Sequence, residues 1–167
     1  MGAPKKQRRK YETPKKPYDR ARIENERKIK QNFGLRRKKE IWKAESTLRT
    51  FRQRARELQA KPDEKKEKAL FQRLQSMGLP SKNLEDVLEI GLEDMLARRL
   101  QTIVHKKGLA NSPLQARQFI VHGHVIVDGK RAKWPSYIVA HGEEEKISLH
   151  PDMEKSMIAK EQEAKKK

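Results

Sequence analysis

The chain has 167 residues, of which 41 are Lys or Arg and 23 are Asp or Glu, giving a net charge of +18. Charged residues make up 38% of it and hydrophobic residues 34%, which is apolar material for one modest core and not for a large single-domain enzyme. There is no cysteine, which excludes zinc fingers, iron–sulfur clusters, disulfide scaffolds and cysteine nucleophiles. Surplus cations gain free energy by displacing the counterions of a polyanion, so a polyanion is the expected partner.

Apolar stretches are short throughout the sequence. None approaches the roughly 18–20 consecutive apolar residues that a membrane span needs. The N-terminal segment also lacks the apolar region of a signal peptide. We therefore expect no membrane partner.

The positive charge is concentrated at the N-terminus. Residues 1–50 hold 18 basic and 6 acidic residues, residues 51–80 carry a net +4, and residues 81–150 carry a net +1. Residues 1–20 combine three prolines with eight Lys or Arg, and this composition cannot bury enough surface to order itself. We expect residues 1–20 to form a basic extended arm that orders on a partner, and a solvated tail without a binding role is the alternative.

A helical period runs through residues 35–60, within a basic helical domain that we expect at residues 21–80. Its apolar residues recur at steps of three, four and seven, which places them on one helical face: Ile41, Leu48, Phe51, Ala55 and Leu58. The remaining faces carry cations with few acids to neutralise them, so we expect contact with RNA or DNA rather than a merely solvated surface. These cations are Arg36, Arg37, Lys38, Lys39, Lys43, Arg49, Arg52, Arg54 and Arg56.

Residues 81–150 have the composition of a small folded module. One helical face is expected over residues 92–104, and a second helix should begin after Ser112-Pro113, where a hydroxyl cap precedes proline at the first position. Asp128-Gly129 between two β-prone segments predicts a hairpin. The fold class is therefore α+β, with a basic α-helical N-terminal region, two helices packed on a short antiparallel sheet, and a charged C-terminal tail at residues 151–167.

Polar residues of the module fall outside its apolar stripes and predict one cationic surface. Planar donors on such a surface bind phosphates bidentately or stack on bases, so we expect it to read shape and backbone more than base sequence. The expected contact residues are Arg98, Arg99, Lys106, Lys107, Gln115, Arg117, Gln118, His122, His124, Lys130, Arg131, Lys133 and Tyr137.

Several short motifs in the module form a recognisable set, with a further one upstream. They are Arg98-Arg99-Leu100, Ala116-Arg117-Gln118, His122-Gly123-His124, Val127-Asp128-Gly129-Lys130-Arg131, Pro135-Ser136-Tyr137 and, upstream, Asn32-Phe33-Gly34-Leu35-Arg36-Arg37. The first five, within about 60 contiguous residues, resemble the RNA-binding domain of small-subunit ribosomal protein number four, the S-four family. The upstream motif resembles the start of that family's basic helical domain. With both parts present, the sequence is similar to the archaeal/eukaryotic branch.

The resemblance implies a structural constituent of the small ribosomal subunit. It implies direct binding to small-subunit ribosomal RNA, a role in nucleating assembly, and support of decoding accuracy near the messenger entry path. It also implies neighbours from the protein-three and protein-five families and a cytoplasmic location on the ribosome. The sequence departs from the family at Gln101, where Asp is common, and at Pro113, where a basic residue is usual.

The sequence offers weak signals for metal binding and for catalysis, and simpler structural roles explain each of them. His122 and His124 have the spacing of half a metal site, but the other histidines show no ligand spacing, so no metal is predicted. The acidic run 143–145 follows a turn glycine, and Ser112 is explained as a helix cap. We therefore predict no enzyme, no catalytic residue, no cofactor and no small-molecule substrate. An RNA-modifying enzyme and a free ribosome-associated factor that use the same module remain the alternatives.

Overall fold

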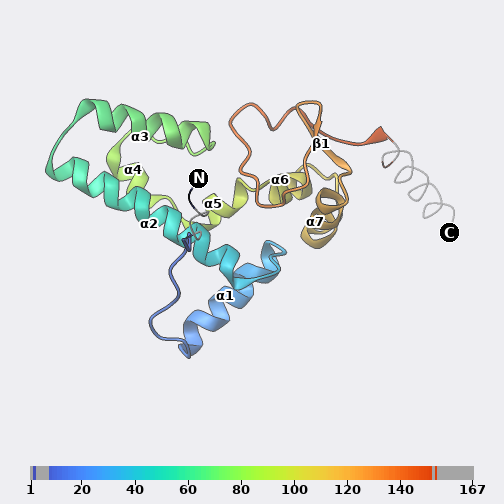
Figure 1. Ribbon diagram of the computed structural model, residues 1–167, viewed down its shortest axis with the longest axis horizontal. Helices are drawn as coiled ribbons and strands as arrows, with labels where there is room; N and C mark the ends of the chain where they lie inside the picture. Colours follow the sequence, from blue (N-terminus) through green and yellow to red (C-terminus); the bar gives the residue numbers. More distant parts are fainter. Residues whose placement is uncertain (1, 3–7, 152, 154–167) are drawn as a thin grey trace.

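The computed structural model describes residues 2, 8–151 and 153, which form seven helices followed by a small sheet. The long helix α2 crosses the molecule with α3 running back along it, while α6, α7 and the strands lie at the other end (Figure 1). The bounds are α1 Arg20–Asn32, α2 Lys38–Ala60, α3 Glu64–Ser76, α4 Leu84–Glu89, α5 Leu92–Ala97, α6 Leu100–Lys106, α7 Pro113–Val121, β1 Val125–Val127, β2 Lys130–Arg131 and β3 Ile147–Leu149. This arrangement confirms the α+β class. Within the described residues, no helix combines the length and apolar character needed to cross a membrane.

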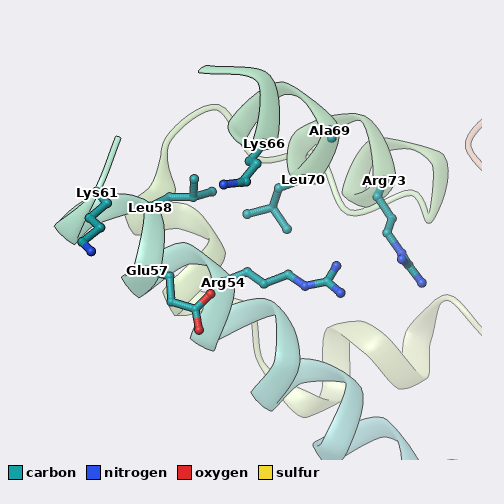
Figure 2. A pocket seen from close by; sticks show the side chains of 8 residues that line it. All are labelled: Arg54, Glu57, Leu58, Lys61, Lys66, Ala69, Leu70 and Arg73. Atoms are coloured by element: carbon teal, nitrogen blue, oxygen red, sulfur yellow. The ribbon is translucent and has the colours of Figure 1, made fainter. Parts of the chain in front are cut away.

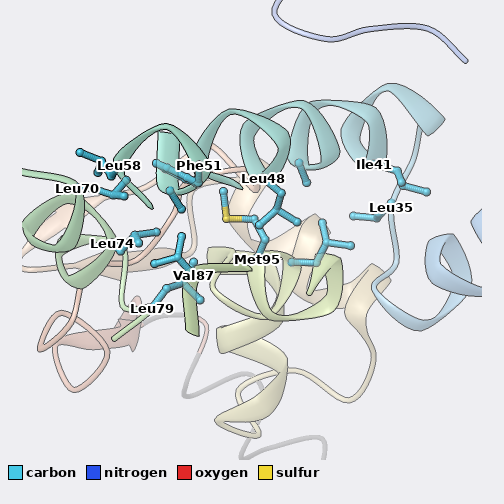
Figure 3. Close-up of a cluster of buried hydrophobic side chains, with 13 residues drawn as sticks. Leu35, Ile41, Leu48, Phe51, Leu58, Leu70, Leu74, Leu79, Val87 and Met95 are labelled. Atoms are coloured by element: carbon cyan, nitrogen blue, oxygen red, sulfur yellow. The ribbon is translucent and has the colours of Figure 1, made fainter. Parts of the chain in front are cut away.

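The apolar face of α2 organises the first of two buried clusters, the N-terminal cluster. All five apolar residues predicted to share that face are buried, because their spacing matches the 3.6-residue turn. Side chains from α3, α4 and α5 pack beneath α2 (Figure 3). The buried members are Leu35, Ile41, Ala44, Leu48, Phe51, Ala55, Leu58, Leu70, Leu74, Leu79, Val87, Met95 and Leu96.

The second buried cluster, the C-terminal cluster, joins α6 and α7 to a three-stranded antiparallel sheet of order β2-β1-β3. The predicted hairpin turn is confirmed, since Asp128 has φ 49° and Gly129 has φ 76°, the left-handed pair of a type I′ turn. Ser112 caps α7 by accepting a hydrogen bond from the Gln115 backbone N–H. The members are Leu100, Ile103, Val104, Ala110, Ala116, Phe119, Ile120, Val125, Val127, Val139, Ile147 and Leu149.

The prediction of one helical face over residues 92–104 was wrong. The chain leaves the helical conformation at Arg99, which has φ −73° and ψ 140° and forms an isolated antiparallel bridge with Ile138. The Leu100 N–H donates to the Tyr137 carbonyl and the Val139 N–H donates to the Arg98 carbonyl, and these backbone hydrogen bonds stabilise the non-helical conformation at Arg99. Because of the break, Leu96 packs in the N-terminal cluster and Leu100 packs in the C-terminal cluster. The apolar residues that appear as one helical face in the sequence therefore belong to two separate cores.

Part of the predicted N-terminal arm lies against α2. The Glu12 backbone N–H donates to the Ser46 hydroxyl at 3.1 Å, and the Tyr11 ring lies 6.0 Å from the Trp42 ring. In Figure 1 the blue segment before α1 runs back toward α2 accordingly. Residues 1 and 3–7 of the arm, and residues 152 and 154–167 of the predicted tail, lie outside the described residues.

Candidate nucleic-acid interface

A single carboxylate, Glu40, joins α2 to the C-terminal module. It lies in the first turn of α2, and its Oε1 accepts hydrogen bonds from the backbone N–H groups of Arg36 at 3.2 Å and Arg37 at 3.3 Å. Arg117 Nη2 donates to the same oxygen at 3.2 Å, and Arg117 Nη1 and Arg99 Nη2 donate to Oε2. Charge-assisted bonds of this kind are stronger than neutral ones, so Glu40 fixes α2 against α7 and the α5–α6 break.

Gln101 makes the second link across this junction. Its side-chain nitrogen lies 2.8 Å from the Gly34 carbonyl and 2.9 Å from the Pro113 carbonyl, and its oxygen accepts from Arg117 at 3.2 Å. An amide both donates and accepts here, whereas an ionised Asp, which the family resemblance leads one to expect at this position, would only accept. The presence of Gln at position 101 therefore has a structural reason, because its side-chain N–H groups donate to the backbone carbonyls of Gly34 and Pro113.

Two acids have shifted pKa values: the half-buried Glu40 at the junction and the buried Glu26 in α1. Burial alone raises the pKa of Glu40, but hydrogen bonding from Arg117 and the charges of Arg99 and Arg117 outweigh burial and lower it. Burial also raises the pKa of Glu26, and hydrogen bonds from Trp42, Lys38 and Arg22 outweigh it so that this pKa is lowered as well. Both carboxylates are therefore held ionised by their neighbours.

We expect acid to destabilise the protein through these two groups. A lowered folded-state pKa contributes stability above the unfolded-state value, about 4.3 for Glu, and that contribution is lost as the pH falls through the folded pKa. The free energy of unfolding, measured with urea between pH 7 and pH 3, should fall below about pH 4.3. Glu45, whose pKa is raised by burial and by the charge of Glu26, acts in the opposite direction.

The Glu40→Gln variant isolates one contribution to this acid dependence. Its unfolding free energy should fall less steeply than that of the wild type, because the Gln side chain does not titrate. If the free energy of unfolding falls equally steeply with decreasing pH in the two proteins, Glu40 is not the group responsible for the acid dependence.

A pocket of about 300 Å³ opens beside this junction. Arg36, Arg37 and Lys43 are exposed at its rim, while Arg99 and Arg117 hold the Glu40 carboxylate at its wall. Five cations thus face one acid. The full lining is Arg36, Arg37, Glu40, Lys43, Arg99, Arg117, Pro135 and Ser136. We call it the junction pocket.

Most of the predicted contact residues of the module are exposed. The exposed ones are Lys106, Lys107, Gln118, His122, Lys130, Arg131, Lys133 and Tyr137. The His122 and His124 rings stack with their centroids 6.1 Å apart, and Arg131 Nη2 lies 2.8 Å from His150 Nε2. Tyr137 donates to Glu143 at 2.9 Å, a bond that, with burial, raises the Tyr137 pKa.

Other predicted contact residues are turned inward. Arg99 is only 7% exposed, whereas the sequence placed it on a cationic surface. Arg98 pairs with Glu144 and donates to the Val139 carbonyl at 3.0 Å, and Arg52 donates to the Ile90 carbonyl at 2.7 Å. These arginines therefore serve the fold at least in part. Contact of any of the predicted residues with RNA stays a prediction.

The two tryptophans differ in exposure. Trp42 packs against the N-terminal cluster, and its indole N–H donates to Glu26 at 3.0 Å. Trp134 is 69% exposed, in the connector that follows the hairpin. Of the two, only Trp134 offers an open aromatic face for stacking.

Two further cavities lie along α2 towards its C-terminal end and share Arg54 and Arg73, and we call them together the α2 groove. The larger, of about 610 Å³, lies between α2 and α3, with Leu58 and Leu70 facing each other across it (Figure 2). It is lined by Arg54, Glu57, Leu58, Lys61, Lys66, Ala69, Leu70 and Arg73. The second, of about 450 Å³, is lined by Arg9, Lys10, Tyr11, Glu12, Ser46, Thr47, Arg49, Thr50, Phe51, Gln53, Arg54 and Arg73.

The sequence reasoning missed several of these cations. Arg9 and Lys10 were predicted only as part of the basic arm and not as individual contact residues. Lys61, Lys66 and Arg73 were not predicted as contact residues at all. Arg73 lies in α3 with no other charged residue within four positions of it in the sequence, so no charge run marks it. Only the packing of α3 on α2 brings it to Arg54. Within the described residues, no group of three or more His, Asp or Glu is placed to hold a metal.

Comparison with known proteins shows which family this chain resembles. A family model described as the S4 domain matches residues 98–144, which run from the α5–α6 break through the hairpin. A small ribosomal subunit protein uS4 from Ignicoccus hospitalis is 48% identical over 156 residues, covering 90% of this chain and 94% of the relative. Proteins of the same name from Methanothermobacter thermautotrophicus and Methanococcus aeolicus are 44% and 48% identical, covering 90% and 91% of this chain and 91% and 89% of the relatives. The chain belongs to the uS4 family.

Membership of the uS4 family confirms the resemblance read from the motifs. The relatives come from archaea, in keeping with the predicted branch. Their shared name describes a protein of the small ribosomal subunit and not an enzyme, which is the class predicted here. The S4 domain match begins at Arg98, close to where the buried clusters change from the first to the second.

Proposed function

We propose that this chain is a structural constituent of the small ribosomal subunit that binds small-subunit ribosomal RNA directly. The observation that carries the proposal is the 44–48% identity to uS4 proteins over about 90% of the chain. The charge distribution supports it, because exposed cations line α2 and the junction pocket, where Glu40 is the sole acid. Its location is accordingly the ribosome in the cytoplasm.

The two parts of the chain have different tasks in this proposal. The basic helical region supplies affinity and salt dependence, and the module positions the RNA through its fixed helices and hairpin. We place their boundary at residues 97–99 rather than at residue 80, because α4 and α5 pack into the N-terminal cluster. Neighbours from the protein-three and protein-five families, proximity to messenger RNA, assembly nucleation and support of decoding accuracy are proposals that rest on the family resemblance.

We expect loss of the junction-pocket cations to weaken RNA binding and flatten its salt dependence. Replacing Arg36, Arg37 and Lys43 by Ala should reduce the slope of log K against log salt by about 2, since each phosphate contact contributes roughly 0.7–0.9. Binding of purified protein to naked small-subunit RNA across a salt series measures this slope. Salt-independent binding of the wild type would overturn the phosphate-contact proposal.

The matched control removes the same charge from acid-rich surroundings. Lys65, Lys68 and Lys82 are exposed, and Lys68 pairs with Glu64 on α3. Their replacement by Ala should leave the slope close to that of the wild type. An equal loss in both variants would show that net charge alone, and not the junction pocket, sets affinity.

Gradient sedimentation of a cell lysate separates the competing functions. One copy per small subunit, resistant to moderate salt, is expected for a structural constituent. Substoichiometric amounts confined to split or stalled subunits would favour a free ribosome-associated factor. Turnover on ribosomal RNA fragments would favour a modifying enzyme.

A further inference from the structure

The α2 groove carries more positive than negative charge, since seven Lys or Arg line it against two acids, Glu12 and Glu57. Within the described residues, the side chains of Arg54, Lys61 and Arg73 have no hydrogen-bonding or ion-pair partner. Arg9 and Lys10 also lack one there, whereas Arg49 pairs with Glu12 and Lys66 pairs with Asp63. Like charges gathered along one groove repel each other, so an anion in the groove is favoured.

Arg54 and Arg73 occupy the centre of this arrangement. Both line the two cavities, and in Figure 2 their side chains extend from the facing helices α2 and α3 toward the same end of the larger one. The Arg73 guanidinium lies over the Phe51 ring, 5.9 Å from its centroid, a cation–π contact between α3 and α2. Two guanidiniums at one place can bind a phosphate bidentately or stack on a base.

The far end of the groove is apolar at its floor. Leu58 and Leu70 are 7% and 4% exposed and face each other there, with Lys61 and Lys66 at the rim (Figure 2). An apolar floor under a cationic rim suits a base or ribose whose phosphate lies above it. From Arg49 to Lys61 the groove follows α2 for about 18 Å at 1.5 Å per residue.

We infer that an unpaired strand of ribosomal RNA lies in the α2 groove, with Arg54 and Arg73 holding its backbone where the two cavities meet. This inference rests on the proposed RNA-binding function and assigns it a second surface, away from the junction pocket and the module.

An acidic protein segment is the competing occupant, and the lining disfavours it. The cores of protein–protein interfaces are enriched in aromatic residues, Met and Arg and depleted of Lys, Glu and Asp. The exposed large hydrophobic residues among those described are Tyr18, Leu114, Val121, Trp134 and Tyr137, and none of them lines the groove. Phe51 and Leu70 are buried in the N-terminal cluster instead.

The Arg54→Ala/Arg73→Ala double variant tests the inference. Both side chains are exposed, so thermal unfolding should match the wild type. Affinity for naked small-subunit RNA should fall about tenfold near 0.2 M salt, because two lost contacts at a slope of roughly 0.7 each give that factor. Hydroxyl-radical footprinting should show one contiguous RNA segment losing protection while the other protected segments remain.

The matched control is Lys65→Ala/Lys68→Ala, which removes two exposed cations from the same helix α3 outside the groove. It should leave affinity and footprint unchanged. If the two variants behave alike while the wild type binds RNA, the groove is not an RNA site, yet the proposed function stands. If the wild type itself fails to bind, the proposed function fails.

Reconstituted small subunits distinguish the competing occupant. The Arg54→Ala/Arg73→Ala protein should still be found with its protein neighbours, because the groove contacts RNA. An unchanged RNA footprint together with the loss of one neighbouring protein would overturn the inference in favour of an acidic protein segment.

Discussion

Replacing Glu40 by Gln should lower the free energy of unfolding by about 3 kcal/mol at pH 7, as expected when one partner of a buried ion pair is removed. Glu40 is 17% exposed, and its partner Arg99 is 9% exposed by side chain. The variant leaves the Arg99 charge buried without a counter-charge, and the desolvation cost of that charge remains. Urea denaturation followed by circular dichroism measures the difference.

The matched control for this variant is Glu24→Gln. Glu24 and Arg20 form an ion pair within α1, but their side chains are 58% and 92% exposed. Exposed pairs contribute about 0–1 kcal/mol, so this variant should lie close to the wild type. An equally small loss for Glu40→Gln would show that the junction is not held by charge.

A double-mutant cycle tests the cause of the loss. Arg99→Met removes the buried charge, so Glu40→Gln/Arg99→Met should cost less than the sum of the two single changes. Additive losses would mean that Arg99 does not contribute through its pairing with Glu40.

Replacing Gly34 by Ala should destabilise the protein by about 3 kcal/mol, from roughly 1–2 for the left-handed backbone and a similar amount for steric overlap. Gly34 has φ 58°, and a Cβ there would lie 2.7 Å from Pro113 Cβ and 2.9 Å from Gln101 Nε2. The overlap falls on the Gln101 link of the junction, because Gln101 also donates to the Gly34 and Pro113 carbonyls. Thermal or urea denaturation measures the loss.

Gly108 separates the two contributions. It has φ 74°, but a Cβ placed on it meets nothing within 4 Å. Gly108→Ala should therefore cost only the backbone share, about 1 kcal/mol. Equal losses for the two variants would show that the close approach of Gly34 to Pro113 is relaxed without cost.

Local patterns in the sequence predicted most of the elements of this fold. The face of α2 from Ile41 to Leu58, the Ser112 cap of α7 and the Asp128-Gly129 turn follow from residues within a few positions of one another. The family resemblance came from equally local motifs, because the S4 domain is one contiguous segment. Short-range backbone preferences and hydrophobic periodicity are sufficient for such features.

The α5–α6 break was not predictable in this way. Leu92 to Val104 has an unbroken helical period, and the competing interaction at Arg99 is a bridge to Ile138, 39 positions further along the chain. The energy of that bridge and of the two separate cores outweighs the local preference for a continuous helix. The consequence for the site is direct, since the break turns Arg99 inward toward Glu40.

The sequence by itself determined the cationic helical region, the small module and the type of partner. Only the tertiary structure decided which cations are available to that partner. Arg99 is buried in an ion pair with Glu40, whereas Arg54 and Arg73 line one cavity and form no ion pair within the described residues. The physical reason is that charge and periodicity are properties of neighbouring residues, whereas burial and ion pairing depend on which distant segments pack together. Glu40 lies 59 and 77 positions from its two arginine partners.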